Sequence, residues 1–158
     1  SGLSNVHPVW IDIENDAKVK RLAGKIDRVL VDAPCSGLGT LRRNPDLKWR
    51  QSPQSVLELG QKQFSILNSA ARLLKPGGRL VYATCSILRQ ENQDIVQAFL
   101  DQHPEFELID PKVALSAPFP ETEGLPVGAH ASNSWWQLWP QEFETDGFFA
   151  AILQKKAS

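Results

Sequence analysis

The segment RLVYATCSILRQEN, residues 79–92, contains the pattern that decides the fold class. Its first six residues are mostly apolar, β-branched or aromatic and predict a short strand. Residues 91–100 then place apolar side chains at helical spacing. Cys85 is therefore expected at the carboxyl end of a strand, where open α/β sheets form their ligand crevice. A lone cysteine is also common as a small buried hydrophobe, so this position alone does not establish a function.

Similar patterns on both sides of this segment predict alternating strands and helices. We expect parallel strands near 9–13, 28–32 and 79–84, with helices near 53–74 and 91–102. Two further strands are predicted at 106–109 and 147–153, the last of them inserted antiparallel. The expected architecture is a partial doubly wound, Rossmann-like α/β fold with a mainly parallel sheet. No glycine-rich phosphate-binding motif occurs, so we expect the first βα unit of such a fold to be missing.

The composition is that of an ordinary globular domain. The 158 residues are 42% hydrophobic and 22% charged, with a formal net charge of −1. No apolar run is long enough for a membrane helix, no signal peptide is recognisable, and two cysteines do not make a disulfide framework. These features predict a cytoplasmic protein without a membrane partner.

The domain interpretation is one unit over residues 1–158. The chain contains no methionine, even at position 1, so we expect it to be the C-terminal portion of a longer protein whose N-terminal part is a partner. Residues 110–147 are rich in proline and tryptophan and lack periodicity, which predicts an irregular excursion.

The second cysteine occupies the same kind of position as the first. Asp32-Ala33-Pro34-Cys35-Ser36-Gly37 follows a buried run, so both thiols are expected to open into one crevice if the two strands are neighbours. Structural roles are also possible, because Pro34 would stop the strand and Asp32 would cap the following turn.

Two thiols and a carboxylate suit substitution at C5 of a pyrimidine. A thiolate that adds to C6 makes C5 electron-rich, and a carboxylate near N3 stabilises the developing charge. The target base must be unpaired or flipped out for the thiol to reach it.

At this point the sequence resembles the RNA cytosine-5 methyltransferases of the NOL1/NOP2/Sun type, in the Sun/Fmu branch that acts on 16S ribosomal RNA. The motifs are DAPCSG at 32–37, RRNPDLKW at 42–49, LKPGGRLVYATCS at 74–86, Gln90-Glu91-Asn92, and DGFFAAIL at 146–153. The order and spacing of the Pro-Cys and Thr-Cys motifs make the resemblance specific. Before the final DGFF, Pro140-Gln141 departs from the Pro-His of many relatives.

The resemblance implies a fold, a cofactor and a set of site residues. It implies an S-adenosyl-L-methionine-dependent methyltransferase fold with RNA, expected to be ribosomal RNA, as substrate and partner. Cys85 would be the nucleophile, and Cys35 would help release the 5-methylcytosine product. Asp32 would lie between cofactor and cytosine, and Asp12 would contact the adenosine portion of the cofactor. No metal site is expected, and the isolated 158 residues are expected to be inactive.

The segment 40–50 has a local excess of positive charge. Arg42, Arg43 and Lys48 are predicted to contact RNA phosphates, with a solvated loop as the alternative. Trp49 either stacks on a base or anchors the loop to the core.

Two other functions remain open from the sequence. A truncated methyltransferase fold would serve as a non-catalytic module that binds RNA or a partner. A hydrolase with a cysteine nucleophile would need a histidine base, and the three histidines lie outside the strand-end motifs.

Overall fold

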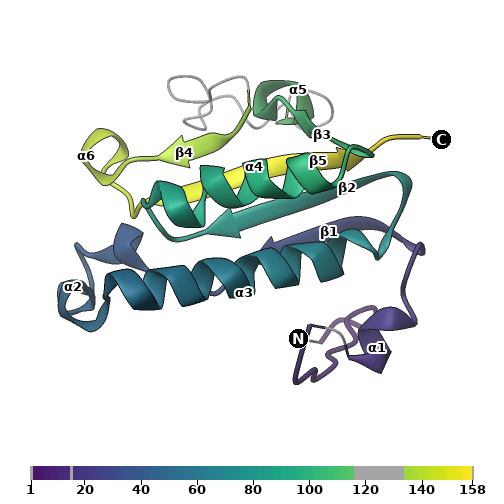
Figure 1. The fold of residues 1–158 in the computed structure, drawn as a ribbon, viewed down its shortest axis with the longest axis horizontal. Coiled ribbons are helices and arrows are strands. Elements are labelled where there is room, and N and C mark those ends of the chain that lie inside the picture. Colours follow the sequence, from purple (N-terminus) through teal and green to yellow (C-terminus); the bar gives the residue numbers. More distant parts are fainter. Residues whose placement is uncertain (1, 15, 116–133, 158) are drawn as a thin grey trace.

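A five-stranded mixed sheet forms the centre of the molecule. The computed structural model describes residues 2–14, 16–115 and 134–157. The strands are β1 (Ile26–Asp32), β2 (Leu74–Thr84), β3 (Phe106–Ile109), β4 (Trp136–Leu138) and β5 (Phe148–Lys155). The order is β1-β2-β5-β3, with β4 beside β5 (Figure 1). β1 is parallel to β2, and β5 is antiparallel to each of its neighbours, so β5 alone runs opposite to the others. The predicted mainly parallel α/β sheet with a late antiparallel strand is confirmed.

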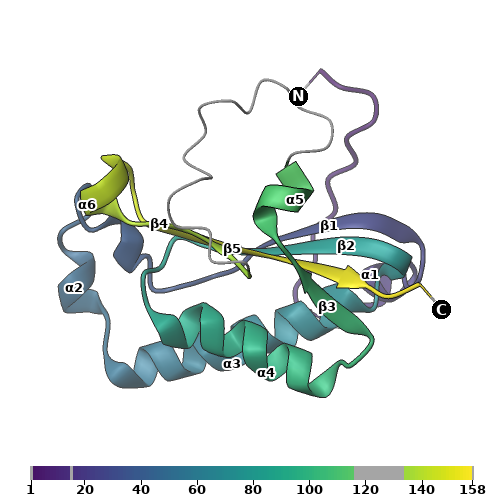
Figure 2. The same ribbon diagram turned by 90° about the horizontal axis from the view of Figure 1, so that it is seen from above.

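Two long helices cover one face of this sheet. Figure 2 shows α3 (Pro53–Ala71) and α4 (Gln93–Gln102) on that face and α5 (Pro111–Leu115) on the other, and Figure 1 shows that α3 and α4 lie side by side. Their apolar sides meet the sheet in a core that includes Leu67, Leu80, Tyr82, Phe99 and Phe149. The remaining elements are short: α1 (Ala17–Lys20), η1 (Leu38–Thr40), α2 (Leu47–Arg50), η2 (Arg89–Glu91) and α6 (Pro140–Phe143).

Local signals explain both ends of α3. Ser52 caps its amino end by accepting a hydrogen bond from the Ser55 backbone, and Pro53 occupies the first helical position. The helix ends at Ala71 instead of 74, because Leu74 is fully buried as the first residue of β2. Burial in the sheet therefore overrides the helical spacing of this leucine.

β2 starts earlier than predicted because it contains a bulge. Ile26 pairs with Leu74 and Arg28 pairs with Arg79, so residues 75–78 are accommodated opposite a single residue of β1. Gly77 has a φ of 76°, a conformation that other residues rarely adopt. Beyond the bulge the register is regular and brings Asp32 opposite Ala83.

Two expectations need correction. Residues 9–13 form no strand; this part of the chain has no ladder partner among the described residues. The stretch 110–147 is not irregular throughout, because it contains α5, β4 and α6; residues 116–133 lie outside the described residues. β4 and β3 pair with opposite halves of the same edge of β5, so the chain leaves and rejoins one edge of the sheet.

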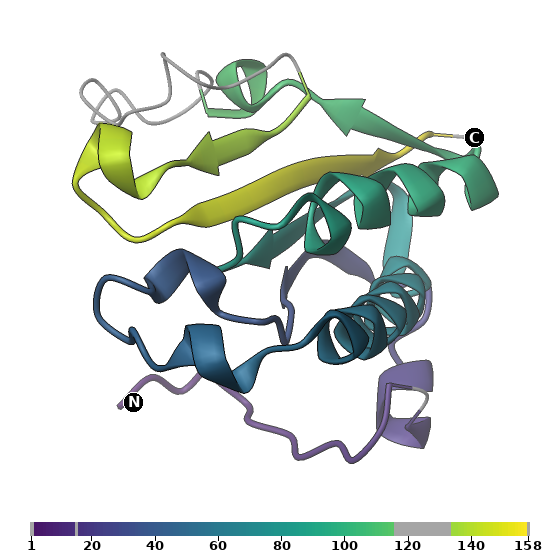
Figure 3. The same cartoon turned by 60° about the vertical axis from the view of Figure 1, so that its left-hand side comes forward.

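In the part of the chain that the structure describes, no helix combines the length and hydropathy needed to cross a bilayer. Figure 3 shows that the segments containing η1, α2 and α6 gather at the end of the sheet where β1 and β2 stop.

Candidate active site

The carboxyl ends of β1 and β2 bring the two cysteines together. Each cysteine follows its strand within three residues, and the parallel register makes the two strand ends neighbours. The Sγ atoms of Cys35 and Cys85 lie 3.4 Å apart, and both thiols are free and half-buried. The prediction that both thiols lie together at the same edge of the sheet is therefore confirmed.

The two thiols differ in acidity because they share a hydrogen bond. The hydrogen bond with Cys35 lowers the pKa of Cys85 to about 7, although desolvation and the negative charges of Asp32 and Glu91 oppose this shift. The same hydrogen bond and burial raise the pKa of Cys35 well above its ordinary value. Of the two thiols, Cys85 is therefore the more acidic, and Cys35 is the one that donates a hydrogen bond when Cys85 is ionised.

A buried carboxylate links the residues that follow the two cysteines. Glu91 in η2 is fully buried and accepts a hydrogen bond of 2.7 Å from the backbone N–H of Ser36. The hydroxyls of Ser36 and Ser86 both donate to its other oxygen. The Gln63 amide of α3 donates to Glu91 at 3.1 Å and to the Pro34 carbonyl at 2.9 Å. One side chain therefore connects α3 with two segments, residues 33–39 after β1 (the Cys35 loop) and residues 85–88 after β2 (the Cys85 loop).

The Cys85 loop is held by a second set of buried hydrogen bonds. The Thr84 hydroxyl donates to Asn92 Oδ1 at 2.6 Å, and the Asn92 amide donates to the Ser86 carbonyl at 2.9 Å. Tyr82 donates its hydroxyl proton to the Glu91 carbonyl at 2.6 Å. The residues on both sides of Cys85 are therefore fixed by the core.

Close backbone contacts join the two loops to the start of β5. The Gly39 N–H donates to the Cys85 carbonyl at 2.9 Å, and the Gly147 N–H donates to the Gly39 carbonyl at 2.8 Å. A Cβ atom on Gly39 would lie 2.2 Å from the Gly147 carbonyl oxygen, so no larger residue fits there.

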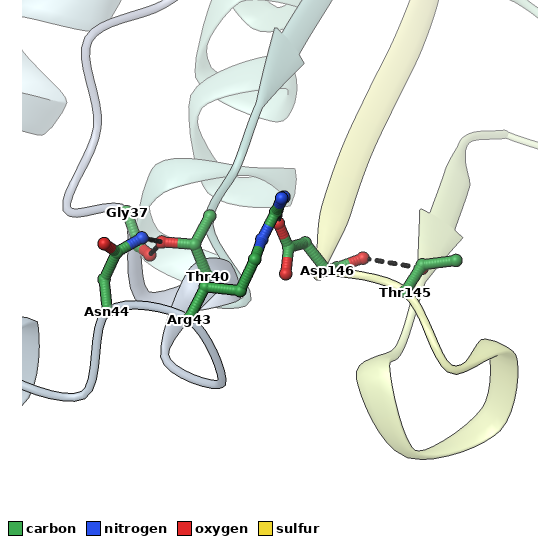
Figure 4. Close-up of polar contacts among 6 residues, drawn as sticks. All are labelled: Gly37, Thr40, Arg43, Asn44, Thr145 and Asp146. Carbon is green, nitrogen blue, oxygen red and sulfur yellow. Dashed lines mark hydrogen bonds and ion pairs between the residues drawn. The ribbon is translucent and has the colours of Figure 1, made fainter.

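An ion pair reinforces this junction. The guanidinium of Arg43 contacts the buried carboxylate of Asp146, and Figure 4 shows this pair beside the contacts of Thr40 with Gly37 and Asn44. The Arg43 side chain is still 70% exposed, whereas that of Asp146 is 2% exposed. Arg43 was predicted only as an RNA contact; the structure also assigns it an intramolecular partner.

The rest of the predicted basic segment lies at the surface. Arg42 and Lys48 are exposed, and the Lys48 ammonium lies 4.8 Å from the centroid of the Trp49 ring. Trp49 is 81% exposed. The alternative in which Trp49 anchors the loop to the core is therefore wrong.

Asp12 and Asp32 line one cavity on the far side of β1 from β2. It has a volume of about 690 Å³ and is otherwise lined mainly by apolar side chains of β1, α3 and residues 11–14. Trp10 donates its indole proton to Asp12 at 2.8 Å, which orients that carboxylate. Over the described ranges, no cluster of three or more histidine, cysteine or acidic side chains is arranged to hold a metal ion.

Comparison with known proteins identifies the family. The model of the family described as 16S rRNA methyltransferase RsmB/F matches residues 2–154. The chain belongs to this family. It is 42% identical over 155 residues to the probable ribosomal RNA small subunit methyltransferase B of Bacillus subtilis, covering 98% of this chain and 33% of that protein. It is 43% identical over 132 residues to the ribosomal RNA small subunit methyltransferase B of Klebsiella pneumoniae, covering 84% and 27%.

Solved structures agree with this assignment. NSun6 from Pyrococcus horikoshii, crystallised with SFG, superposes with a TM-score of 0.74 at 27% identity, covering 99% of this chain and 36% of that one. The RsmB/F chain described here thus spans about a third of the length of the relatives that it matches.

Sequence analysis named Glu91 and Asp146 only as parts of motifs and gave neither a role in the site. It did not predict the close approach of Gly39 to Gly147. The repeated Cys-Ser pair at 35–36 and 85–86 is the signal that could have suggested a common partner for the two serines.

Proposed function

We propose that this chain carries the reacting cysteines of an enzyme that methylates C5 of a cytosine in RNA, with 16S ribosomal RNA as the substrate class. The observation that supports it most is the 3.4 Å separation of two thiols with opposite pKa shifts at adjacent strand ends. The ribosomal RNA specificity rests on the names of the family and of its relatives.

The proposed first step uses the Cys85 thiolate. Its sulfur bonds to C6 of the cytosine, the C5–C6 double bond opens, and C5 becomes nucleophilic enough to accept a methyl group. Asp32 stands at the end of β1 and is exposed, where its carboxylate can stabilise charge on the base.

Product release needs a base, and the thiol pair offers one at the right stage. The pKa of Cys35 is raised above all by its hydrogen bond to Cys85. Once the Cys85 sulfur is bonded to C6 it is no longer an anion, so this cause disappears and Cys35 ionises more readily. Removal of the C5 proton then restores the C5–C6 double bond and breaks the Cys85–C6 bond. We propose that Cys35 takes part in this release of the product.

The cavity beside β1 suits S-adenosyl-L-methionine as the cofactor. Asp12 and Asp32 offer carboxylates for hydroxyl or positively charged groups, and the apolar lining suits an adenine ring. When bound, the cofactor supplies the electrophilic methyl group. The related NSun6 structure contains SFG, an analogue of S-adenosylmethionine.

RNA is proposed to approach over the segment 40–50, where the exposed Arg42 and Lys48 offer contacts to phosphates. Arg43 remains a proposed contact because most of its side chain is exposed despite its pairing with Asp146.

The test separates the two thiols in the intact protein that contains this chain. With radiolabelled S-adenosylmethionine and a 16S RNA transcript, Cys85→Ala should abolish both methylation and the covalent protein–RNA species. Cys35→Ala should still form that species and fail to resolve it, giving a slow band on denaturing gels. If the two variants exchange phenotypes, the roles are reversed. If the parent protein binds RNA and transfers no methyl group to it, the chain belongs to a binding module instead.

We also propose that the 158 residues alone bind S-adenosylmethionine weakly and are inactive. No glycine-rich strand–turn–helix motif for the cofactor occurs in them. Calorimetric titration of the isolated chain checks this, and micromolar affinity would contradict it.

A further inference from the structure

We propose that Glu91 is a positioning residue that holds the Cys35 and Cys85 loops at the separation needed for the reaction. The inference rests on the proposed methyl transfer, but it concerns a residue that touches neither thiol. Its basis is the set of contacts that Glu91 makes with the residue following each cysteine.

Glu91 contacts each loop through the serine that follows the cysteine. One oxygen accepts the backbone N–H of Ser36, and the other accepts the hydroxyls of both Ser36 and Ser86, whose oxygens lie 3.3 Å apart. Ser36 and Ser86 each follow a cysteine directly. A shift of Glu91 would therefore move both loops, and with them the two Sγ atoms.

Burial of the Glu91 carboxylate is energetically costly. Its side chain is 0% exposed, and among the ion pairs of the described residues none involves it. A buried carboxylate without a counter-ion is unfavourable unless several hydrogen bonds satisfy it, as the two serines and Gln63 do. An apolar residue would fill this volume without that requirement, but it could not join the two loops.

Glu91 is itself fixed from the side of the core. Its backbone carbonyl accepts the Tyr82 hydroxyl, and the following Asn92 bonds to Thr84 and to the Ser86 carbonyl. The carboxylate is thus a rigid reference point for both loops. Errors of about 1 Å in the position of reacting groups lower rates by about a hundredfold, so such rigidity has catalytic consequences.

An activating role for the Glu91 charge is inconsistent with its sign. A negative charge near Cys85 disfavours the thiolate, and the Glu91 charge indeed raises the pKa of Cys85, against the larger lowering by Cys35. Removal of the charge should make Cys85 more acidic. An experiment can therefore distinguish a change in the reactivity of Cys85 from a change in the separation of the two thiols.

The first measurement uses the 158-residue chain without RNA. Dibromobimane becomes fluorescent when it alkylates two neighbouring thiols, whereas iodoacetamide reports one thiol at a time. In Glu91→Gln we expect bridging by dibromobimane to slow by about tenfold or more, since the carboxylate link is weakened. Alkylation of Cys85 by iodoacetamide at pH 7 should be as fast as in the parent chain or faster. The matched control is Glu58→Gln, the same change at an exposed position of α3.

The second measurement uses the intact protein with S-adenosylmethionine and 16S RNA. Glu91→Gln should lower kcat by about tenfold or more and leave KM for the cofactor unchanged. The pH midpoint of the rate should stay the same or move down, which a loss of thiolate would not produce.

Two further variants keep the proposal testable if Glu91→Gln does not fold. Ser36→Ala and Ser86→Ala each remove one hydroxyl donor and leave the carboxylate in place, and each should slow bridging by a smaller factor. Parent-like bridging in Glu91→Gln, or in both serine variants, would overturn the positioning role. Slow bridging in Glu91→Gln, together with an intact parent protein that methylates no RNA, would refute the proposed function and leave the positioning role standing.

Discussion

The two loops that carry the cysteines begin alike and continue in opposite directions. Each follows a strand of the only parallel pair in the described sheet, and each places a serine after its cysteine. Beyond Cys85 the chain turns into the core, where Glu91 and Asn92 are fully buried. Beyond Cys35 it runs outward into α2, where Trp49 is 81% exposed.

This difference explains how one site can be both rigid and accessible. The Cys85 loop is held by buried hydrogen bonds on both sides, which would fix the position of the proposed nucleophile. The Cys35 loop leads to the exposed basic segment, which is the surface that we propose for RNA. The Cys85 loop suits formation of the proposed bond to the base, and the Cys35 loop suits the proposed contact with RNA.

We expect the largest effect from a substitution at Gly39, where the two loops are in contact. In Gly39→Ala the new Cβ would lie 2.2 Å from the Gly147 carbonyl oxygen and 2.7 Å from the Cys85 carbonyl oxygen. Backbone must move, so we expect a loss of about 2–3 kcal/mol in the free energy of unfolding, measured by urea denaturation.

Gly60→Ala in α3 is the control for that variant. Its Cβ would make an ordinary 3.6 Å contact with Ile95, and alanine is favoured over glycine inside a helix by about 0.5–1 kcal/mol. We therefore expect Gly60→Ala to be neutral or stabilising. Parent-like stability of Gly39→Ala would show that the loops are not in the contact described.

Cys35→Ala removes the hydrogen bond that makes the two thiols differ in pKa. Without its donor, the pKa of Cys85 should rise from about 7 toward its ordinary value of about 8.5, which lowers the thiolate fraction at pH 7 by roughly fifteenfold. The pH profile of Cys85 alkylation by iodoacetamide should move upward accordingly.

Cys35→Ser retains a hydroxyl donor and should leave the midpoint closer to that of the parent chain. An unchanged midpoint in Cys35→Ala would mean that the thiol pair does not set the acidity of Cys85.

The outward course of the Cys35 loop predicts a role for Trp49 in binding RNA. Stacking of a base on an aromatic side chain contributes about 1–3 kcal/mol, so Trp49→Ala should weaken binding of single-stranded RNA by about tenfold. Fluorescence anisotropy with a labelled oligonucleotide measures this. Trp10 is equally exposed, at 80%, and lies outside the basic segment, so Trp10→Ala should bind RNA like the parent. Equal losses in the two variants would refute a specific role for Trp49.

The smallest effect is expected at the surface of the inward loop. Arg89 and Asp94 form a 2.9 Å ion pair with side chains 79% and 50% exposed. Solvent and salt screen such pairs, so Asp94→Asn should change the free energy of unfolding by less than about 0.5 kcal/mol, measured by thermal and urea unfolding. A larger loss would show that the Cys85 loop depends on its surface as well as on the core.

Much of the fold was predictable because its strands and long helices carry strong local patterns. The cap at Ser52, the apolar run before Asp32 and the short strand 106–109 all occur where their residue types predict. The proximity of the cysteines followed from a topological rule, since parallel neighbours end at the same edge.

The remainder depends on partners distant in the sequence. The alternation at 9–13 resembles a strand, but a strand also needs a neighbour to pair with. Arg43 and Asp146 are 103 positions apart, and Glu91 and Ser36 are 55 apart. No local propensity encodes such contacts, so the junction between the loops became visible only in three dimensions.

The place of β5 in the sheet has a consequence for the order in which the protein is made. β5 pairs with β2 on one edge and with β3 on the other, although both neighbours leave the ribosome before it. At about 5–20 residues per second, synthesis from Thr84 to Lys155 takes roughly 4–14 s, during which the backbone groups on this edge of β2 lack the partner that β5 provides. The sheet can therefore be completed only after residue 155 has been synthesised, and until then this edge of β2 is free to pair with another strand.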